Sequence, residues 1–205
     1  MGLRYWPTAL FGVLAATAFS AHASDLPPPG PVLAPVTAPV MVPALYDPTR
    51  WELRFGGFMH GVGSVEKNTW DVNAEIVLPQ FFSPAGYWSV LVPRLHAGVN
   101  GNVNGRTSAV YAGLLWTVPI FDRLFTELFI DAAFHNGSLT ADGTHNALGC
   151  NPLFHVGASI GYRVDQDWSV MGTFDHLSNG SGIGLTHCGR NQGVNNYGLR
   201  IGYAF

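Results

Sequence analysis

Apolar and polar residues alternate with a period of two along most of the chain, and this alternation constrains the fold more than any other feature of the sequence. In the segment 68–79, Trp70 and Ile76 occupy even positions, whereas Asp71 and Glu75 occupy odd positions. Successive side chains of a β-strand point to opposite faces, so this period predicts strands with one apolar and one polar face.

Eight segments carry the pattern, with turn-forming residues between them. They are 51–60, 68–79, 87–99, 106–118, 124–135, 153–163, 167–178 and 195–205. The alternation is weaker in the third segment, which contains Pro93, and in the fourth, which is nearly apolar throughout. The pattern fits two folds: a soluble β-sandwich that shows its charges to water, and a membrane barrel that shows its apolar face to lipid and pairs its charges inside.

The N-terminal residues indicate export. Residues 1–23 combine Arg4, an apolar run over 6–20 and an Ala-His-Ala cleavage site, which is typical of a secretory signal peptide. A membrane anchor is the alternative, but the apolar run is short and a processing site follows it. No later run reaches 18 apolar residues, so we expect no transmembrane helix.

Prolines recur through residues 24–48, which we interpret as an extended lead-in without helix or sheet. Contact of this segment with peptidoglycan or with a partner is the alternative interpretation. Together these features predict that residues 49–205 form an all-β, eight-stranded antiparallel outer-membrane barrel. A barrel of this size has room only for side chains, so its interior is expected to be packed and polar.

Composition limits the classes of molecule that the chain is expected to bind. Charged residues are only 11% of the chain and the net charge is −3, so nothing points to nucleic acid. The sequence has no spacing typical of a metal or cofactor site, and we expect neither.

The barrel topology places the two cysteines on one side of the membrane. Outer-membrane barrels have short periplasmic turns and longer outer loops, so the long segments 136–152 and 179–194 should lie outside. Cys150 and Cys188 fall in these two segments, which predicts a disulfide in an exported protein. The alternatives are two free thiols, or a metal site that uses Cys188 and the adjacent histidine.

In the segment 173-TFDHLSNGSG-182, two polar residues, His176 and Ser178, occupy positions of the seventh strand where the alternation predicts apolar residues. Both side chains should then face lipid near the outer leaflet, where polar groups are costly, whereas Asp175 should point inward. A serine hydroxyl becomes a useful nucleophile when a histidine takes its proton, so the pair is a candidate catalytic site. An ordinary polar girdle at the membrane surface is the alternative.

At this point the chain resembles the PagL-type lipid A 3-O-deacylase family, which is similar to acyloxyacyl hydrolases. The resemblance rests on 174-FDHLSNG-180, 191-NQGVN-195 and the closing 198-GLRIGYAF-205. It implies an outer-membrane serine esterase that removes an ester-linked acyl chain from lipid A, the membrane anchor of lipopolysaccharide. The expected partner of the chain is therefore lipid A in the outer leaflet, and a homodimer is a further expectation.

The resemblance also implies residue roles. Ser178 would be the nucleophile and His176 its base, and Asn179 with Gly180 would position the loop or form the oxyanion hole. Where the family has a glutamate that orients the histidine, this chain has Asn195, which lies on the outward beat. Its amide oxygen could hold the imidazole as asparagine does in papain-like enzymes, but without a charge, so weaker activity is expected. The competing function is a non-enzymatic small barrel, an adhesin or structural protein.

Overall fold

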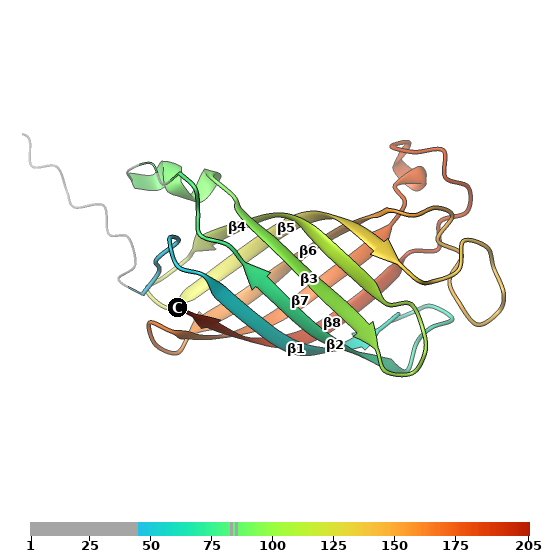
Figure 1. Ribbon diagram of the computed structural model, residues 1–205, viewed down its shortest axis with the longest axis horizontal. Helices are drawn as coiled ribbons and strands as arrows, with labels where there is room; N and C mark the ends of the chain where they lie inside the picture. Colours follow the sequence, from blue (N-terminus) through green and yellow to red (C-terminus); the bar gives the residue numbers. More distant parts are fainter. Residues whose placement is uncertain (1–44, 83, 85) are drawn as a thin grey trace, which may run out of the picture. The chain divides into compact units, whose positions relative to one another are not determined.

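The computed structural model describes residues 45–82, 84 and 86–205, so the predicted signal peptide and most of the proline-rich lead-in lie outside the described residues. Eight strands form the molecule (Figure 1). They are β1 (Glu52–His60), β2 (Thr69–Val77), β3 (Arg94–Asn102), β4 (Ala109–Pro119), β5 (Leu124–His135), β6 (Leu153–Arg163), β7 (Trp168–Ser178) and β8 (Val194–Ala204). Two short 3-10 helices, η1 (Gly86–Leu91) and η2 (Ser181–Ile183), lie between strands. In this part of the chain no helix has the length and hydropathy needed to span a bilayer.

Each strand pairs antiparallel with its neighbours in sequence, and β1 pairs with β8, so the sheet closes into a barrel. One end of the barrel, here called the loop end, carries the segments 61–68, 103–108, 136–152 and 179–193. The opposite end, here called the turn end, carries the first residue of β1 and the last of β8 (Figure 1). The strand β7 runs from the turn end to the loop end, which places its last residues among the long loops.

The predicted eight-stranded antiparallel barrel is confirmed, and most strands begin and end within a few residues of the expected positions. The third strand is the exception, because it was expected over 87–99 and is found at Arg94–Asn102. Most of the apolar run before it forms η1 instead. Pro93 explains the difference, since proline has no N–H to donate to a sheet ladder and is tolerated just before a strand begins. The connection between β2 and β3 therefore runs over 78–93, longer than the segment 80–86 that the sequence predicts.

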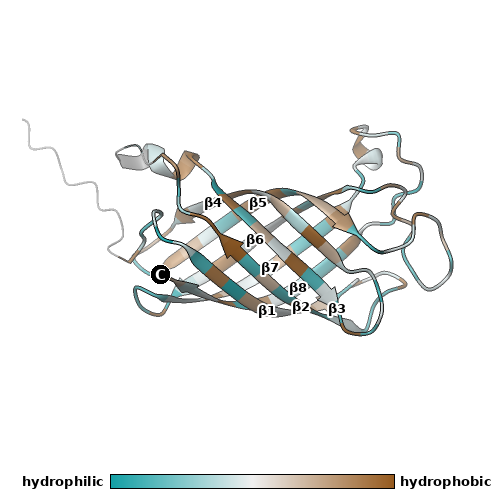
Figure 2. Ribbon diagram, viewed as in Figure 1, coloured by the Kyte–Doolittle hydropathy of each residue, from teal (hydrophilic) through white to brown (hydrophobic). Residues whose placement is uncertain are grey.

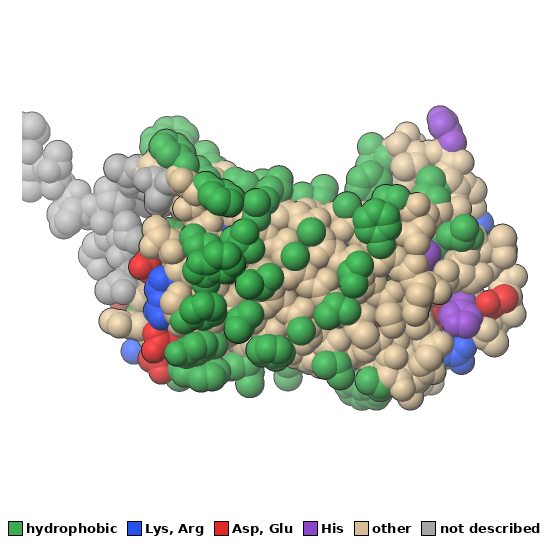
Figure 3. Space-filling model, in the orientation of Figure 1, with side chains coloured by type: hydrophobic (Ala, Val, Ile, Leu, Met, Phe, Trp, Pro, Cys, Tyr) green, Lys and Arg blue, Asp and Glu red, His purple; other side chains and the backbone are tan. Residues whose placement is uncertain are grey.

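The two faces of the barrel wall differ as the alternation predicts. Residues of the apolar beat, such as Phe55, Val72 and Leu199, are exposed on the outside. Apolar and hydrophilic residues alternate along the strands in Figure 2. On the face drawn in Figure 3, charged side chains gather at the two ends and hydrophobic side chains cover the wall between them. This is the surface expected for a barrel whose wall contacts lipid acyl chains.

Charged side chains fill the interior and neutralise one another. The guanidinium of Arg54 contacts Glu52 at 2.9 Å, Glu75 at 3.1 Å and Glu127 at 2.7 Å, and Arg200 reaches Glu75 at 2.7 Å. All five side chains are buried. Buried charges are costly unless they are paired and hydrogen-bonded, so this network accounts for these five charged residues on the inner face of the wall.

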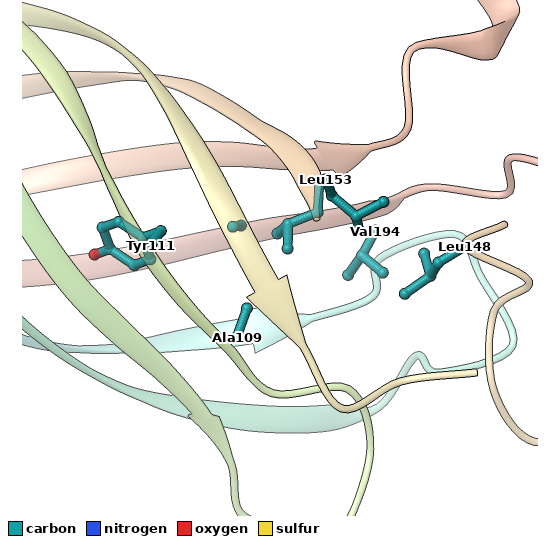
Figure 4. Packing of buried hydrophobic residues seen from close by; sticks show 7 residues of the cluster. Ala109, Tyr111, Leu148, Leu153 and Val194 are labelled. Atoms are coloured by element: carbon teal, nitrogen blue, oxygen red, sulfur yellow. The ribbon is translucent and has the colours of Figure 1, made fainter. Parts of the chain in front are cut away.

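Toward the loop end the interior also contains an apolar cluster. Seven buried side chains pack together there, and Figure 4 shows the cluster from close by. They are Ala109, Tyr111, Ala133, Leu148, Leu153, Leu177 and Val194. Leu177 lies between His176 and Ser178 in β7 and is 2% exposed, so this cluster supports the barrel wall from behind the candidate site.

Candidate active site

His176 and Ser178 lie on one face of β7, near its loop end. Their neighbours Asp175 and Leu177 are buried inside the barrel, whereas His176 and Ser178 are partly exposed on the outer wall. The alternation of a strand accounts for this arrangement, because residues two apart share a face. The sheet register places Phe154 of β6 beside Ser178.

Asn195 is the direct neighbour of His176 across the β7–β8 pair. Its Oδ1 lies 2.6 Å from Nδ1 of His176, so the amide oxygen accepts a hydrogen bond from the Nδ1–H group. With its proton on Nδ1, the neutral imidazole has a free electron pair on Nε2. This is the tautomer that a general base requires.

Ser178 Oγ forms no hydrogen bond to His176 or to any other described residue, and its hydroxyl is therefore free to rotate. Hydrogen bonds between catalytic groups are often long or absent before substrate binds. Two side chains that follow one another on the same strand face can approach through rotamer changes alone.

Gly193 packs directly against the imidazole of His176. A Cβ atom built at this glycine would lie 2.9 Å from Cε1 of the ring and 3.5 Å from Nε2. The glycine has φ +58°, in the left-handed region that side chains rarely adopt. Both the backbone conformation and the close approach therefore favour glycine here.

A chain of hydrogen bonds holds Gly193 in place. Its carbonyl oxygen accepts a short hydrogen bond from Nδ2 of Asn146, which is buried in the segment 136–152. The backbone N–H of Asn146 in turn donates to Oε1 of Glu66 at 2.8 Å. The ring of His176 is thus positioned by contacts that begin in the first loop of the barrel.

Glu66 joins three of the four long loops. Its carboxylate accepts hydrogen bonds from the Thr107 N–H at 2.8 Å, the Thr107 hydroxyl at 2.9 Å and the Asn146 N–H, and it contacts His60 at 2.9 Å. Burial alone would raise the pKa of this carboxyl, but the hydrogen bonds from His60, Thr107 and Asn146 outweigh burial and lower the pKa to about 2. Glu66 is therefore ionised at neutral pH although it is fully buried.

Asn179 organises the loop that follows Ser178. Its Nδ2 lies 2.9 Å from the carbonyl oxygen of Leu148 and 3.1 Å from that of Cys188, and its Oδ1 accepts from the N–H of Ser181 at 2.9 Å. The side-chain amide is thus occupied by loop contacts. Gly180, which is also buried, follows with φ +73°, and its N–H has no acceptor among the described residues.

The predicted disulfide between Cys150 and Cys188 is confirmed, with Cα atoms 5.4 Å apart. It joins the segments 136–152 and 179–193 next to the Asn179 amide, which bonds to both of them. The cross-link and the amide therefore fix the same loop pair beside Ser178. In the described part of the chain, no group of three His, Cys, Asp or Glu side chains is arranged to hold a metal ion.

The alternation placed His176, Ser178 and Asn195 on one face, and the structure brings the histidine and the asparagine into contact. It did not point to Gly193, Asn146 or Glu66 as residues of the site. Only Gly193 carries a signal in the sequence, as the glycine of 191-NQGVN-195. Asn146 and Glu66 act through backbone groups of distant loops, and composition or spacing does not reveal such contacts.

Comparisons with known proteins agree with this architecture. A family model described as lipid A 3-O-deacylase (PagL) matches residues 59–204, which include all of the proposed catalytic residues. The solved structure of the outer membrane enzyme PagL is 16% identical, with a TM-score of 0.52, and the alignment covers 74% of this chain and 97% of that one. A de novo designed transmembrane β-barrel is 14% identical, with a TM-score of 0.50, and the alignment covers 78% of this chain and 98% of that one. No curated protein sequence matches the chain.

Proposed function

The chain belongs to the lipid A 3-O-deacylase (PagL) family and is a barrel of the bacterial outer membrane, and on that premise we propose a reaction for its outer wall. The proposed reaction is hydrolysis of the ester-linked acyl chain at position 3 of lipid A, with Ser178 as nucleophile and His176 as general base. The observation that carries it is the 2.6 Å hydrogen bond between Asn195 and His176, which leaves Nε2 of His176 free to accept a proton. His176 lies on the same face of β7 as the Ser178 hydroxyl. The proposal needs one chain only, and a homodimer remains a prediction.

The reaction proceeds in two steps. Ser178 Oγ bonds to the acyl carbonyl carbon while its proton moves to Nε2 of His176. The bond from the carbonyl carbon to the sugar oxygen then breaks, and that oxygen leaves with the proton. Water next attacks the acyl-serine ester and gives a proton to Nε2, which returns it to Ser178 Oγ as the fatty acid leaves. The substrate ester reaches the outer wall within the leaflet, so it never has to enter the packed interior.

Gly180 is the better candidate for oxyanion stabilisation. The amide of Asn179 already donates to loop carbonyl groups, whereas the N–H of Gly180 is free and lies two residues after the nucleophile. A free backbone N–H near the nucleophile is the donor that many serine hydrolases use for the negative oxygen of the intermediate. Asn179 then serves to position this backbone segment, which was the other role considered for it.

Mass spectrometry of lipid A tests the proposal. The purified full chain, incubated with lipid A in detergent, should yield a product lighter by one hydroxyacyl group at position 3. A serine-directed fluorophosphonate should also add its mass to the peptide that contains Ser178. Unchanged lipid A would favour the non-enzymatic barrel, and a label on another residue would overturn the assignment of the nucleophile.

Replacing Asn195 by aspartate should raise kcat about tenfold, because a charge-assisted hydrogen bond stabilises the imidazolium better than a neutral one. Aspartate has the same shape as asparagine, so the 2.6 Å contact is kept. The rate of lipid A deacylation in detergent measures the effect. Asn104→Asp is the matched control, since Asn104 is an exposed loop-end residue whose Oδ1 only accepts from Trp70 N–H. A rate for Asn195→Asp at or below that of the unmodified chain would contradict the orienting role.

A further inference from the structure

A pocket opens at the loop end, on the far side of β8 from Ser178. It has a volume of about 420 Å³ and is lined by the end of β1, the first loop and the start of β2. The lining residues used below are Met59, Val62, Lys67 and Trp70. None of them takes part in the proposed reaction.

The pocket is joined to the catalytic residues through the backbone. The N–H of Val62 donates to the carbonyl oxygen of Asn195 at 2.8 Å, and Asn195 holds His176. The pocket and the imidazole are separated by β8 and by the end of β1. Neighbouring strands lie about 4.8 Å apart, so the separation is on the order of 10–15 Å. A disaccharide headgroup can bridge a distance of this order.

Lys67 gives the pocket a positive charge that no carboxylate of the described residues neutralises. It is the only lysine in the sequence, it is exposed, and its ammonium group contacts no carboxylate among the described residues. The nearest carboxylate in sequence, Glu66, is buried and satisfied by His60, Thr107 and Asn146. Asp71, on the adjacent strand, is bound to His60 inside the barrel. No described acidic group therefore neutralises the ammonium.

The surroundings of Lys67 fit a lipid headgroup. Met59 and Trp70 are 47% and 56% exposed, so apolar side chains and one ammonium group line the same pocket. An amphipathic tryptophan near the end of a membrane strand is typical of the headgroup level. On the other flank of the site, a pocket of about 480 Å³ beside Phe154 and the disulfide has no lysine or arginine in its lining. Because only one flank of the site carries a positive charge, an anionic headgroup is expected to bind on the Lys67 side.

We propose that the Lys67 pocket binds a phosphate group on the sugar headgroup of the substrate, and so orients the acyl ester toward Ser178. This inference rests on the proposed function, because it takes the phosphorylated lipid as the substrate of the same wall. The headgroup would lie over β1 and β2 at the loop end, and the scissile ester would lie over β7.

Binding can be measured without turnover in the Ser178→Ala background. The probes are lipid A and the same lipid after phosphatase treatment, each in detergent micelles. Lys67→Gln should weaken the binding of phosphorylated lipid A about tenfold, as expected for loss of one charged contact, while binding of the dephosphorylated lipid stays unchanged. Lys67→Arg should retain the affinity. Arg190→Gln is the matched control, because it removes the same charge from another exposed loop position.

Three results would overturn the proposal. Lys67→Gln could leave the affinity unchanged, it could weaken both lipids equally, or Arg190→Gln could weaken binding as much as Lys67→Gln. Competition by inorganic phosphate alone, at the affinity of the lipid, would identify a site for free anions instead. The binding assay does not depend on catalysis, so a chain that binds phosphorylated lipid A through Lys67 but never deacylates it would refute the proposed reaction alone.

Discussion

Alanine in place of Ser178 is expected to lower the rate of lipid A deacylation at least about a thousandfold, because no other described hydroxyl lies beside His176 on the outer wall of β7. The barrel should fold normally, since Ser178 is half-buried and its hydroxyl makes no hydrogen bond to any residue that the structure describes. The measurement is the initial rate on lipid A in detergent, together with the thermal unfolding of the barrel.

His176→Ala should cost a similar factor, and the double variant should be no slower than either single one, because the two groups act as a unit. Ser181→Ala is the matched control. Its hydroxyl donates to the Gly189 carbonyl at 3.3 Å in the same loop, so it tests the loss of a nearby serine without the loss of the nucleophile. Additive losses in the double variant would show that the two residues act separately.

Gly193→Ala is expected to lower kcat about a hundredfold, since displacing a catalytic group by roughly 1 Å can lower the rate by that factor. The added methyl group would lie 2.9 Å from Cε1 of His176, so the ring must move away from Asn195 or from Ser178. Alanine also resists φ +58°, which should lower the free energy of unfolding by about 1 kcal/mol.

Gly189→Ala separates these two effects. Gly189 has φ +64° in the same loop, but a Cβ atom there would have nothing within 4 Å. The Gly189 variant should therefore show the backbone strain with nearly full activity. Equal kinetic losses in both variants would mean that loop strain, and not contact with the imidazole, controls the rate.

Much of the fold could be predicted because the strands carry their own signal. Alternation assigned Asp71 and Glu75 to one face of their strand and Trp70 and Ile76 to the other, because a half-buried strand tolerates no slip of register. The export signal and the eight segments then identified the polar face as the interior of a barrel. It failed at the third strand, where an apolar run before Pro93 looks like a strand but forms η1. Periodicity cannot distinguish a short apolar helix from a short buried strand.

The site was predictable only where it lies on strands. The outward direction of His176 and Asn195 follows from the alternation along β7 and β8, whereas the role of Asn195 came from the family resemblance. The cysteine pair follows from the topology of the long loops. Glu66 and Asn146 are 80 positions apart, and their contact uses a backbone N–H group that every non-proline residue has. The contact therefore cannot be predicted from the identity of the two residues, and only the folded loops show how His176 is positioned.

The proposed catalytic groups share β7 with Leu177, which belongs to the apolar cluster of the barrel interior, and this limits how the sequence can change. Inserting or deleting a single residue between Trp168 and His176 would exchange the two faces of the strand's upper half. The imidazole and the hydroxyl would then point into the apolar cluster of the interior, and Leu177 would point toward the lipid. Both hydrolysis and folding of the barrel would therefore fail. Variation in length must therefore be confined to the loops, while the strand itself can change only by substitution.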